Sequence, residues 1–205
     1  MNKILLLGCG HMGSALLNSW NLKTKNSFLI VDPNQYKKIN KGLNKKIICF
    51  KSFNEIKIST LNKIEIVVFA IKPQIAKEVI REVAKFKFKK NTVFISIVAG
   101  VKFSLFNKFI AKKEQLIRVM PNMPAQINMG MSCLVKNKNV TLKNKKLVDH
   151  LFSTVGETLW LKKESDINKV TAISGSGPGY IFFIIDAYEK AAFEMGLGEE
   201  DTKKL

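Results

Sequence analysis

The sequence predicts an α/β protein with a doubly wound, mainly parallel sheet followed by a helical segment. Short apolar strands alternate with helical segments over residues 3–120, and a glycine-rich turn joins the first strand to the first helix. The strand pattern then stops near residue 160, ahead of one long apolar helix. Strands that alternate with helices pair in parallel through right-handed crossovers, and this gives the doubly wound arrangement.

Each expected strand is a short apolar run that a glycine or proline turn ends. The strands are expected at residues 3–7, 27–31, 47–50, 64–71, 92–98 and 115–120, and helices at 12–22 and 74–86. Residues 178–197 are expected to form one helix that begins at Pro178, and residues 199–205 to begin another. The 178–197 helix has only a narrow polar stripe, so either a partner chain or further sequence is expected to cover it.

The composition favours a folded cytoplasmic protein. Its 205 residues are 46% hydrophobic, which suffices for a sizeable core and excludes a disordered chain. No apolar run approaches the ~20 residues of a membrane span, and the N-terminus does not resemble a secretory signal. The three cysteines are widely spaced and form no CxxC pair, so reduced thiols are expected and no metal site.

The net charge of +18 raises the question of nucleic-acid binding. Nearly all the basic residues are lysine, and only Arg81 and Arg118 carry the guanidinium fork that suits base and phosphate recognition. The basic excess lies in residues 1–148, whereas residues 149–205 are slightly acidic. We therefore expect no nucleic-acid partner, and a basic first region that suits an anionic nucleotide or an acidic metabolite.

The strongest motif is the G-x-G-x-x-G turn from Gly8 to Gly13, placed between a strand and a helix. In such a turn the first glycine permits the tight bend, the second lets the backbone approach a pyrophosphate, and the third lets the helix pack closely. The helix N-terminus then faces the phosphate charge. The motif predicts a dinucleotide site, and its structural alternative is a glycine turn without a ligand.

Asp32 follows the second strand, 19 residues after Gly13. A carboxylate at that place can accept hydrogen bonds from the adenosine ribose, which favours NAD over NADP. The nearby Lys37 and Lys38 could instead attract a 2′-phosphate. A third reading is an Asp-Pro turn that caps the next helix. The cofactor is therefore expected to be NADPH or NADH.

Three later strand ends and one loop complete the set of candidate motifs. The strand ends are AIKP (residues 70–73), SIVAG (96–100) and MPNMP (120–124), and they should border the cofactor crevice if they meet at one sheet edge. The loop SGSGPGY (174–180) leads into the long helix, and its small residues can seat a carboxylate or allow close helix packing.

Together these motifs resemble those of the Δ1-pyrroline-5-carboxylate reductases. The resemblance rests on GCGHMGSA (8–15), FAIKPQ (69–74), SIVAGV (96–101), RVMPNMPAQINMGMS (118–132) and TAISGSGPGYIFFIIDA (171–187). It implies a Rossmann-type nucleotide domain, residues 1–160, and the start of an all-helical dimerisation and substrate domain, residues 161–205. It also implies NAD(P)H-dependent reduction of 1-pyrroline-5-carboxylate to L-proline, with self-association through the 178–197 helix.

The same resemblance assigns roles to individual residues of this chain. The residues implied to bind the cofactor are Gly8, Gly10, His11, Met12, Gly13, Ala70, Lys72, Pro73, Ala99, Gly100 and Asn122, and the spacing argument above adds Asp32. Asn122, Ser174 and Ser176 are candidate pocket residues, and no catalytic side chain is assigned. Members of the family continue past this point with a Ser-Pro-Gly-Gly-Thr-Thr loop that holds the substrate, and no such loop occurs here.

Two other functions remain as alternatives. The first is a truncated, catalytically inactive NAD(P)-binding protein, which the missing substrate loop favours. The second is a β-hydroxyacid-type dehydrogenase, which should place a catalytic lysine on the long helix near the cofactor. Lys190 lies well inside that helix and far from its N-terminal end, which argues against the second alternative.

Overall fold

The computed structural model describes residues 2–41 and 46–204. One eight-stranded sheet organises the chain, with the strand order β3-β2-β1-β4-β5-β6-β7-β8. Neighbouring strands pair in parallel except β6 and β7, which are antiparallel. Chain order reverses at β1, which lies between β2 and β4, so the sheet has the switch point of a doubly wound fold.

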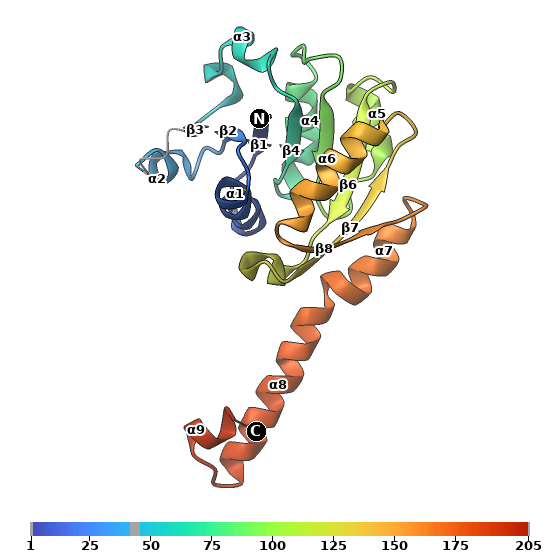
Figure 1. Ribbon diagram of the computed structural model, residues 1–205. Coiled ribbons are helices and arrows are strands. Elements are labelled where there is room, and N and C mark those ends of the chain that lie inside the picture. The colour runs from blue at the N-terminus through green and yellow to red at the C-terminus, as the bar shows by residue number, and fades with distance from the viewer. Residues whose placement is uncertain (1, 42–45, 205) are drawn as a thin grey trace.

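The elements alternate along the chain as the pattern predicts (Figure 1). The strands are β1 (Lys3–Leu7), β2 (Ser27–Val31), β3 (Ile47–Phe50), β4 (Ile66–Phe69), β5 (Val93–Ser96), β6 (Gln115–Met120), β7 (Gly130–Lys136) and β8 (Gly156–Trp160). The α-helices are α1 (His11–Lys23), α2 (Tyr36–Asn40), α3 (Ile58–Leu61), α4 (Ala76–Val83), α5 (Phe103–Phe109), α6 (Leu142–Ser153), α7 (Asp166–Val170), α8 (Gly177–Glu194) and α9 (Glu199–Thr202). Short 3-10 turns occur at η1 (Phe53–Glu55), η2 (Pro73–Ile75) and η3 (Met123–Ile127), and a π-helical turn at Thr171–Gly175.

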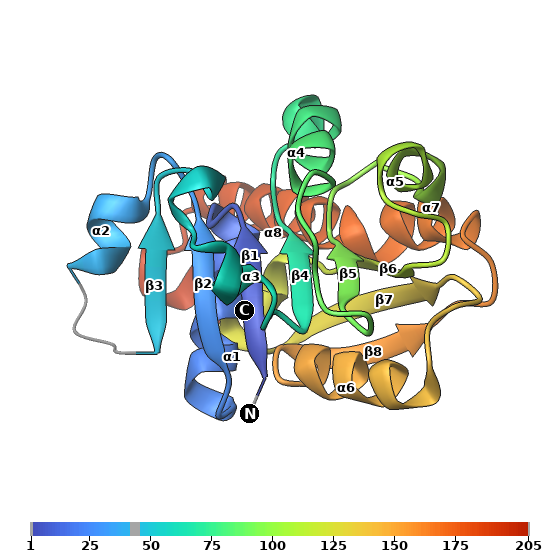
Figure 2. The same cartoon turned by 90° about the horizontal axis from the view of Figure 1, so that it is seen from above.

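Two apolar cores form, one on each face of the sheet. Alternate residues of β1 point to opposite faces, so Leu6 joins the core under α1 and α6, and Leu5 joins the core under α3, α4 and α5. Trp20 of α1 anchors the first core: it is fully buried, and its indole N–H donates to the carbonyl of Leu151 at 2.8 Å. Figure 2 shows the helices on the two sides of the strands.

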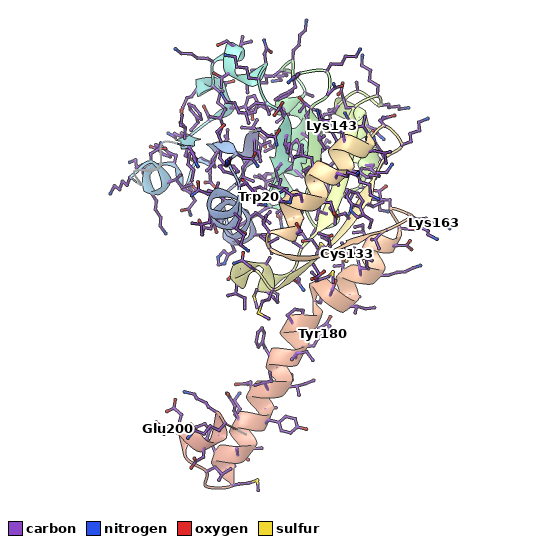
Figure 3. The ribbon with its side chains drawn as sticks, in the orientation of Figure 1. Trp20, Cys133, Lys143, Lys163, Tyr180 and Glu200 are labelled. Carbon is purple, nitrogen blue, oxygen red and sulfur yellow. The ribbon has the colours of Figure 1, made fainter. Side chains whose placement is uncertain are left out.

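Beyond β8 the chain leaves the sheet as an arm of α7, the π turn, α8 and α9 (Figure 1). No residue of α8 is buried, although the helix is rich in large apolar side chains. Phe183 and Tyr188 expose 76% and 75% of their surface, and Tyr180 projects from the arm in Figure 3. In the described part of the chain, no helix has the length and apolar character needed to cross a membrane.

Several boundaries differ from the expected ones. The segment 74–86 splits into η2 and α4, because Pro73 favours a tight first turn, and the long helix spans 177–194 because the chain turns at Gly196 with a φ of 87°. The helix expected at 199–205 is the short α9, and residue 205 lies outside the described residues. The sequence patterns predict no strand at β7 or β8 and no helix at α6, yet β7 and β8 complete one end of the sheet.

Candidate dinucleotide site

The sheet order brings the predicted motifs to one edge. The strands β1, β4, β5 and β6 are consecutive neighbours and parallel, so their carboxyl ends lie side by side. The glycine turn follows β1, the Lys72-Pro73 turn follows β4, Ala99-Gly100 follows β5, and Asn122 follows β6. The four motifs therefore meet at one edge of the sheet, which is where an open α/β sheet binds its ligands.

The three glycines of the turn have different surroundings. Gly8 has a φ of 88°, and a Cβ there would lie 2.5 Å from the carbonyl oxygen of Ala70. A Cβ on Gly13 would lie 2.6 Å from the carbonyl oxygen of Gly8. A Cβ on Gly10, by contrast, would meet nothing within 4 Å. Gly8 and Gly13 are thus required by packing, whereas the open space at Gly10 fits a ligand that approaches the backbone.

The start of α1 offers free backbone donors beside that open space. Gly10 is the N-cap residue of α1, and no side chain caps the helix. The amide of Ser14 donates to the carbonyl of Gly10 at 2.8 Å, while the amides of residues 10–13 find no acceptor within the described chain. Free amides and the positive end of the helix dipole together suit a pyrophosphate, so the turn fits a dinucleotide.

The Asp32 carboxylate links the glycine turn to the segment that precedes α2. Its Oδ2 accepts from the Cys9 amide at 2.7 Å, and its Oδ1 accepts from the amides of Asn34 and Gln35 at 2.8 and 2.9 Å. Only 8% of the residue is exposed. These are the contacts of an Asp-Pro turn, but without the expected helix cap, because no side chain caps α2, whose N-cap residue is Gln35.

A cavity of about 660 Å³ lies between α1, α2 and η3, beside the free amides. Polar side chains from all three elements line it, namely Ser14 and Asn18 of α1, Gln35 and Lys38 at α2, and Gln126 of η3. Lys38 lines the cavity, whereas its neighbour Lys37 does not. Gln126 was not a sequence candidate, because its position 112 residues after Ser14 gives no hint that η3 packs against α1.

The other strand-end residues differ in exposure. His11, Lys72, Pro73, Ala99 and Gly100 are exposed, so a ligand along this edge can reach them. Met12 and Ala70 are half-buried and pack against the α1 core.

Asn122 and Ser174 lie where the sheet joins the arm. The Asn122 side chain donates from Nδ2 to the Ser174 carbonyl at 3.0 Å and accepts the Met131 amide on Oδ1 at 2.8 Å. The Ser174 hydroxyl donates to the Val170 carbonyl at 2.9 Å, one turn earlier in the arm. In the described chain the Ser176 hydroxyl has no hydrogen-bond partner, which leaves it as the free serine of the loop.

A second link joins the sheet to the arm through an ion pair. Arg118 of β6 donates from Nη1 to Glu164 Oε1 at 2.8 Å, and only 5% of the arginine side chain is exposed. The same carboxylate oxygen accepts the Phe103 amide at 2.6 Å. Glu164 therefore connects β6, the start of α5 and the segment that leads into α7.

The three thiols are buried, and Cys9 lies inside the glycine turn. Burial, followed by the charge of Asp32, raises the pKa of Cys9 to about 11, and the same causes raise the pKa of Cys49 to about 12. Burial also raises the pKa of Cys133, which Figure 3 places near the base of the arm. All three side chains therefore stay protonated at neutral pH.

We expect the folded chain to resist iodoacetamide at pH 8, because the thiolate is the reactive form. Since the folded state binds these protons more tightly, its stability should fall as the pH rises from about 8.5, the unfolded thiol pKa, towards 11. Mass spectrometry of native and urea-unfolded samples measures the first effect. Rapid alkylation of Cys9 in the native sample would contradict it.

Two family models match this chain, one over most of the sheet and one over the arm. Residues 3–100 match the family model "NADP oxidoreductase coenzyme F420-dependent", and residues 164–205 match "Pyrroline-5-carboxylate reductase dimerisation". The pyrroline-5-carboxylate reductase of Haemophilus influenzae is 34% identical over 152 residues, which are 74% of this chain and 56% of that enzyme. The chain thus matches little more than half the length of that relative.

Other matches extend over nearly the whole chain. The pyrroline-5-carboxylate reductase of Pasteurella multocida is 30% identical over 211 residues, covering 98% of this chain and 73% of that enzyme. A crystal structure of the Plasmodium falciparum pyrroline carboxylate reductase with NADP bound superposes with a TM-score of 0.83 at 27% identity, covering 99% of this chain and 73% of that one. The chain therefore belongs to the pyrroline-5-carboxylate reductase family.

Proposed function

We propose that this chain binds NADPH along the carboxyl edge of its sheet and takes part in the reduction of 1-pyrroline-5-carboxylate to L-proline. The observation that carries the proposal is the Gly10 turn, whose free amides share one sheet edge with the exposed loops that follow β4 and β5. Family membership supplies the substrate. The bound nicotinamide would supply the hydride that the imine carbon receives.

The residues along the edge of the sheet have different proposed roles in binding the cofactor. The amides of the turn, with Gly8, Gly10, His11, Met12 and Gly13, hold the pyrophosphate. Asp32 keeps the turn in shape, and the loops with Ala70, Lys72, Pro73, Ala99 and Gly100 border the rest of the cofactor. Because a protonated imine is already electrophilic, the protein contributes mainly orientation and exclusion of water.

The arm supports the second part of the proposal. Residues 1–160 form the nucleotide-binding unit, and residues 161–205 begin a helical unit that associates with a second copy through the exposed face of the long helix. An isologous pairing would cover the apolar side chains that no residue of this chain covers in the described structure. Three free, widely spaced thiols favour a reducing compartment, so the proposed location is the cytoplasm.

Lys38 is the side chain expected to select NADPH over NADH. It lines the cavity beside the turn, whereas the Asp32 carboxylate is held by backbone amides. Lys38→Glu should weaken NADPH binding about tenfold or more, since a lost charge-assisted contact costs roughly 1.5–3 kcal/mol, and should affect NADH much less. Fluorescence titration with both nucleotides measures the difference.

Lys37→Glu is the matched control, because it makes the same charge change next to the cavity without lining it. It should change NADPH affinity by less than Lys38→Glu does. Equal losses in the two variants, or equal losses for both nucleotides, would show that Lys38 acts only through the general field or not at all.

The reaction itself is tested by incubating the purified chain with NADPH and pyrroline-5-carboxylate and measuring both NADPH oxidation and proline. Proline formed in step with NADPH oxidation supports the proposed reaction. Nucleotide binding without proline would instead favour the alternative of an NAD(P)-binding protein without catalysis. A chain that binds neither nucleotide would overturn both.

A further inference from the structure

Proline at position 178 deprives the Ser174 carbonyl, at the base of the arm, of its usual helical hydrogen bond. In an α-helix the carbonyl of residue 174 would accept the amide of residue 178, but proline has no amide hydrogen. The next amide, that of Gly179, donates to the Ser176 carbonyl at 3.0 Å. The local chain thus leaves the Ser174 carbonyl without a helical donor, inside the π-helical turn Thr171–Gly175.

The donor comes from the nucleotide-binding side of the molecule. Asn122, two residues after β6, donates to the Ser174 carbonyl at 3.0 Å, and its other end is fixed by the Met131 amide of β7 at 2.8 Å. The residue is only 8% exposed. Both ends of the amide are therefore committed to backbone groups, one in the sheet and one in the arm.

Close packing surrounds this hydrogen bond. A Cβ on Gly175 would lie 3.3 Å from the Met120 side chain, so the turn sits directly against the end of β6. The Cys133 sulfur lies 3.8 Å from the Ser174 hydroxyl on the same side. The Asn122 hydrogen bond therefore lies in a closely packed contact between the end of β6 and the π-helical turn, which we call the joint.

We infer that Asn122 is a positioning residue that fixes the direction of α8 by capping the carbonyl that Pro178 leaves unpaired. It sets the geometry between the cofactor edge of one chain and the helix that meets a second copy, and it does so without contacting the cofactor. The inference concerns the joint alone and goes beyond the proposed reaction, so it can fail while that reaction stands.

The test measures the direction of the arm in the full chain without substrate. Spin labels at Lys143→Cys on α6 and Glu194→Cys on α8 occupy exposed positions, and the three native thiols are buried. Labelled chains are diluted with unlabelled ones, so that double electron-electron resonance reports distances within a chain. We expect one narrow distance distribution in the parent and a distribution at least twice as broad in Asn122→Asp, which keeps the acceptor but loses the donor.

Rescue separates this role from general stabilisation. Pro178→Ala restores an amide at position 178, so the double variant Asn122→Asp/Pro178→Ala should regain the narrow distribution. Asn137→Asp is the matched control: Asn137 also bridges backbone groups, donating to the Glu114 carbonyl at 2.8 Å and accepting the Leu116 amide at 3.2 Å, but at the opposite end of β6. It should leave the distribution unchanged.

Three results would overturn the inference. They are an unchanged distribution in Asn122→Asp, a double variant as broad as Asn122→Asp alone, and a loss of NADPH affinity in Asn122→Asp with the arm unmoved, which would make Asn122 a cofactor ligand. If Asn122→Asp alone does not fold, recovery of folding in the double variant supports the inference and continued unfolding contradicts it.

Discussion

Gly10→Asp should abolish dinucleotide binding without lowering the stability of the chain. A Cβ at this position meets nothing within 4 Å, and the residue has a φ of −70°, which any L-residue adopts. Aspartate is also a favoured N-cap and suits the positive end of α1, so the melting temperature should stay level or rise. The same carboxylate would occupy the space of the pyrophosphate and repel it, so NADPH affinity should fall at least 100-fold. Differential scanning fluorimetry and nucleotide titration measure the two effects.

Gly8→Ala is the control that separates packing from binding. Its φ of 88° and the 2.5 Å approach to the Ala70 carbonyl make any side chain there strained. It should lower the melting temperature and binding together. If Gly10→Asp binds NADPH like the parent, the turn is a packing motif and not a phosphate site.

Phe183→Glu combined with Tyr188→Glu should convert an associating chain to monomers. Both side chains are about three-quarters exposed, so the fold of one chain does not depend on them. In a symmetric dimer each substitution acts twice, and each buried aromatic contributes roughly 2 kcal/mol, so association should weaken at least 100-fold. Sedimentation equilibrium over a range of concentrations measures it.

Leu142→Glu combined with Ile58→Glu is the matched control. These apolar side chains are 77% and 68% exposed, but they lie on α6 and α3, away from the arm. The control should associate as the parent does. A parent that is monomeric at all concentrations, or an arm variant that associates normally, would contradict the assignment of α8 as the association surface.

The sequence predicts the central sheet well because its strands are continuous apolar runs between glycine or proline turns. The bounds of β1, β2, β3 and β6 agree with the structure residue for residue. The strand order confirms the doubly wound class. The class is predictable because alternation of strands and helices permits few other arrangements. The different needs of the three glycines also follow from the spacing of the motif, and the surroundings of Gly8, Gly10 and Gly13 agree with them.

The sequence patterns do not predict β7 and β8, the two strands at one end of the sheet. The strand β8 is an edge strand of five residues in which Glu157 and Leu159 are exposed, so it carries no apolar run. The strand β7 runs antiparallel to β6, which an alternating strand and helix pattern does not indicate. Both strands are fixed by pairing across the sheet, a contact that local sequence does not encode.

The details of the site depended on contacts between distant segments. Asp32 fits a ribose ligand by its spacing, but only the fold shows both of its oxygens occupied by backbone amides. Likewise, Asn122 and Ser174 are 52 residues apart, and nothing local in either segment indicates that one caps the other. Motif spacing therefore locates the edge of the sheet, while the roles along it come from tertiary hydrogen bonds.

A crystal structure of this chain grown with NADPH tests the proposed cofactor site most directly. We expect density for the pyrophosphate against the amides of residues 10–13, for the 2′-phosphate on the side of Lys38, and for the nicotinamide beside the loop of Ala99 and Gly100. Density for the nucleotide elsewhere, or an ordered water layer at the turn under saturating NADPH, would contradict it.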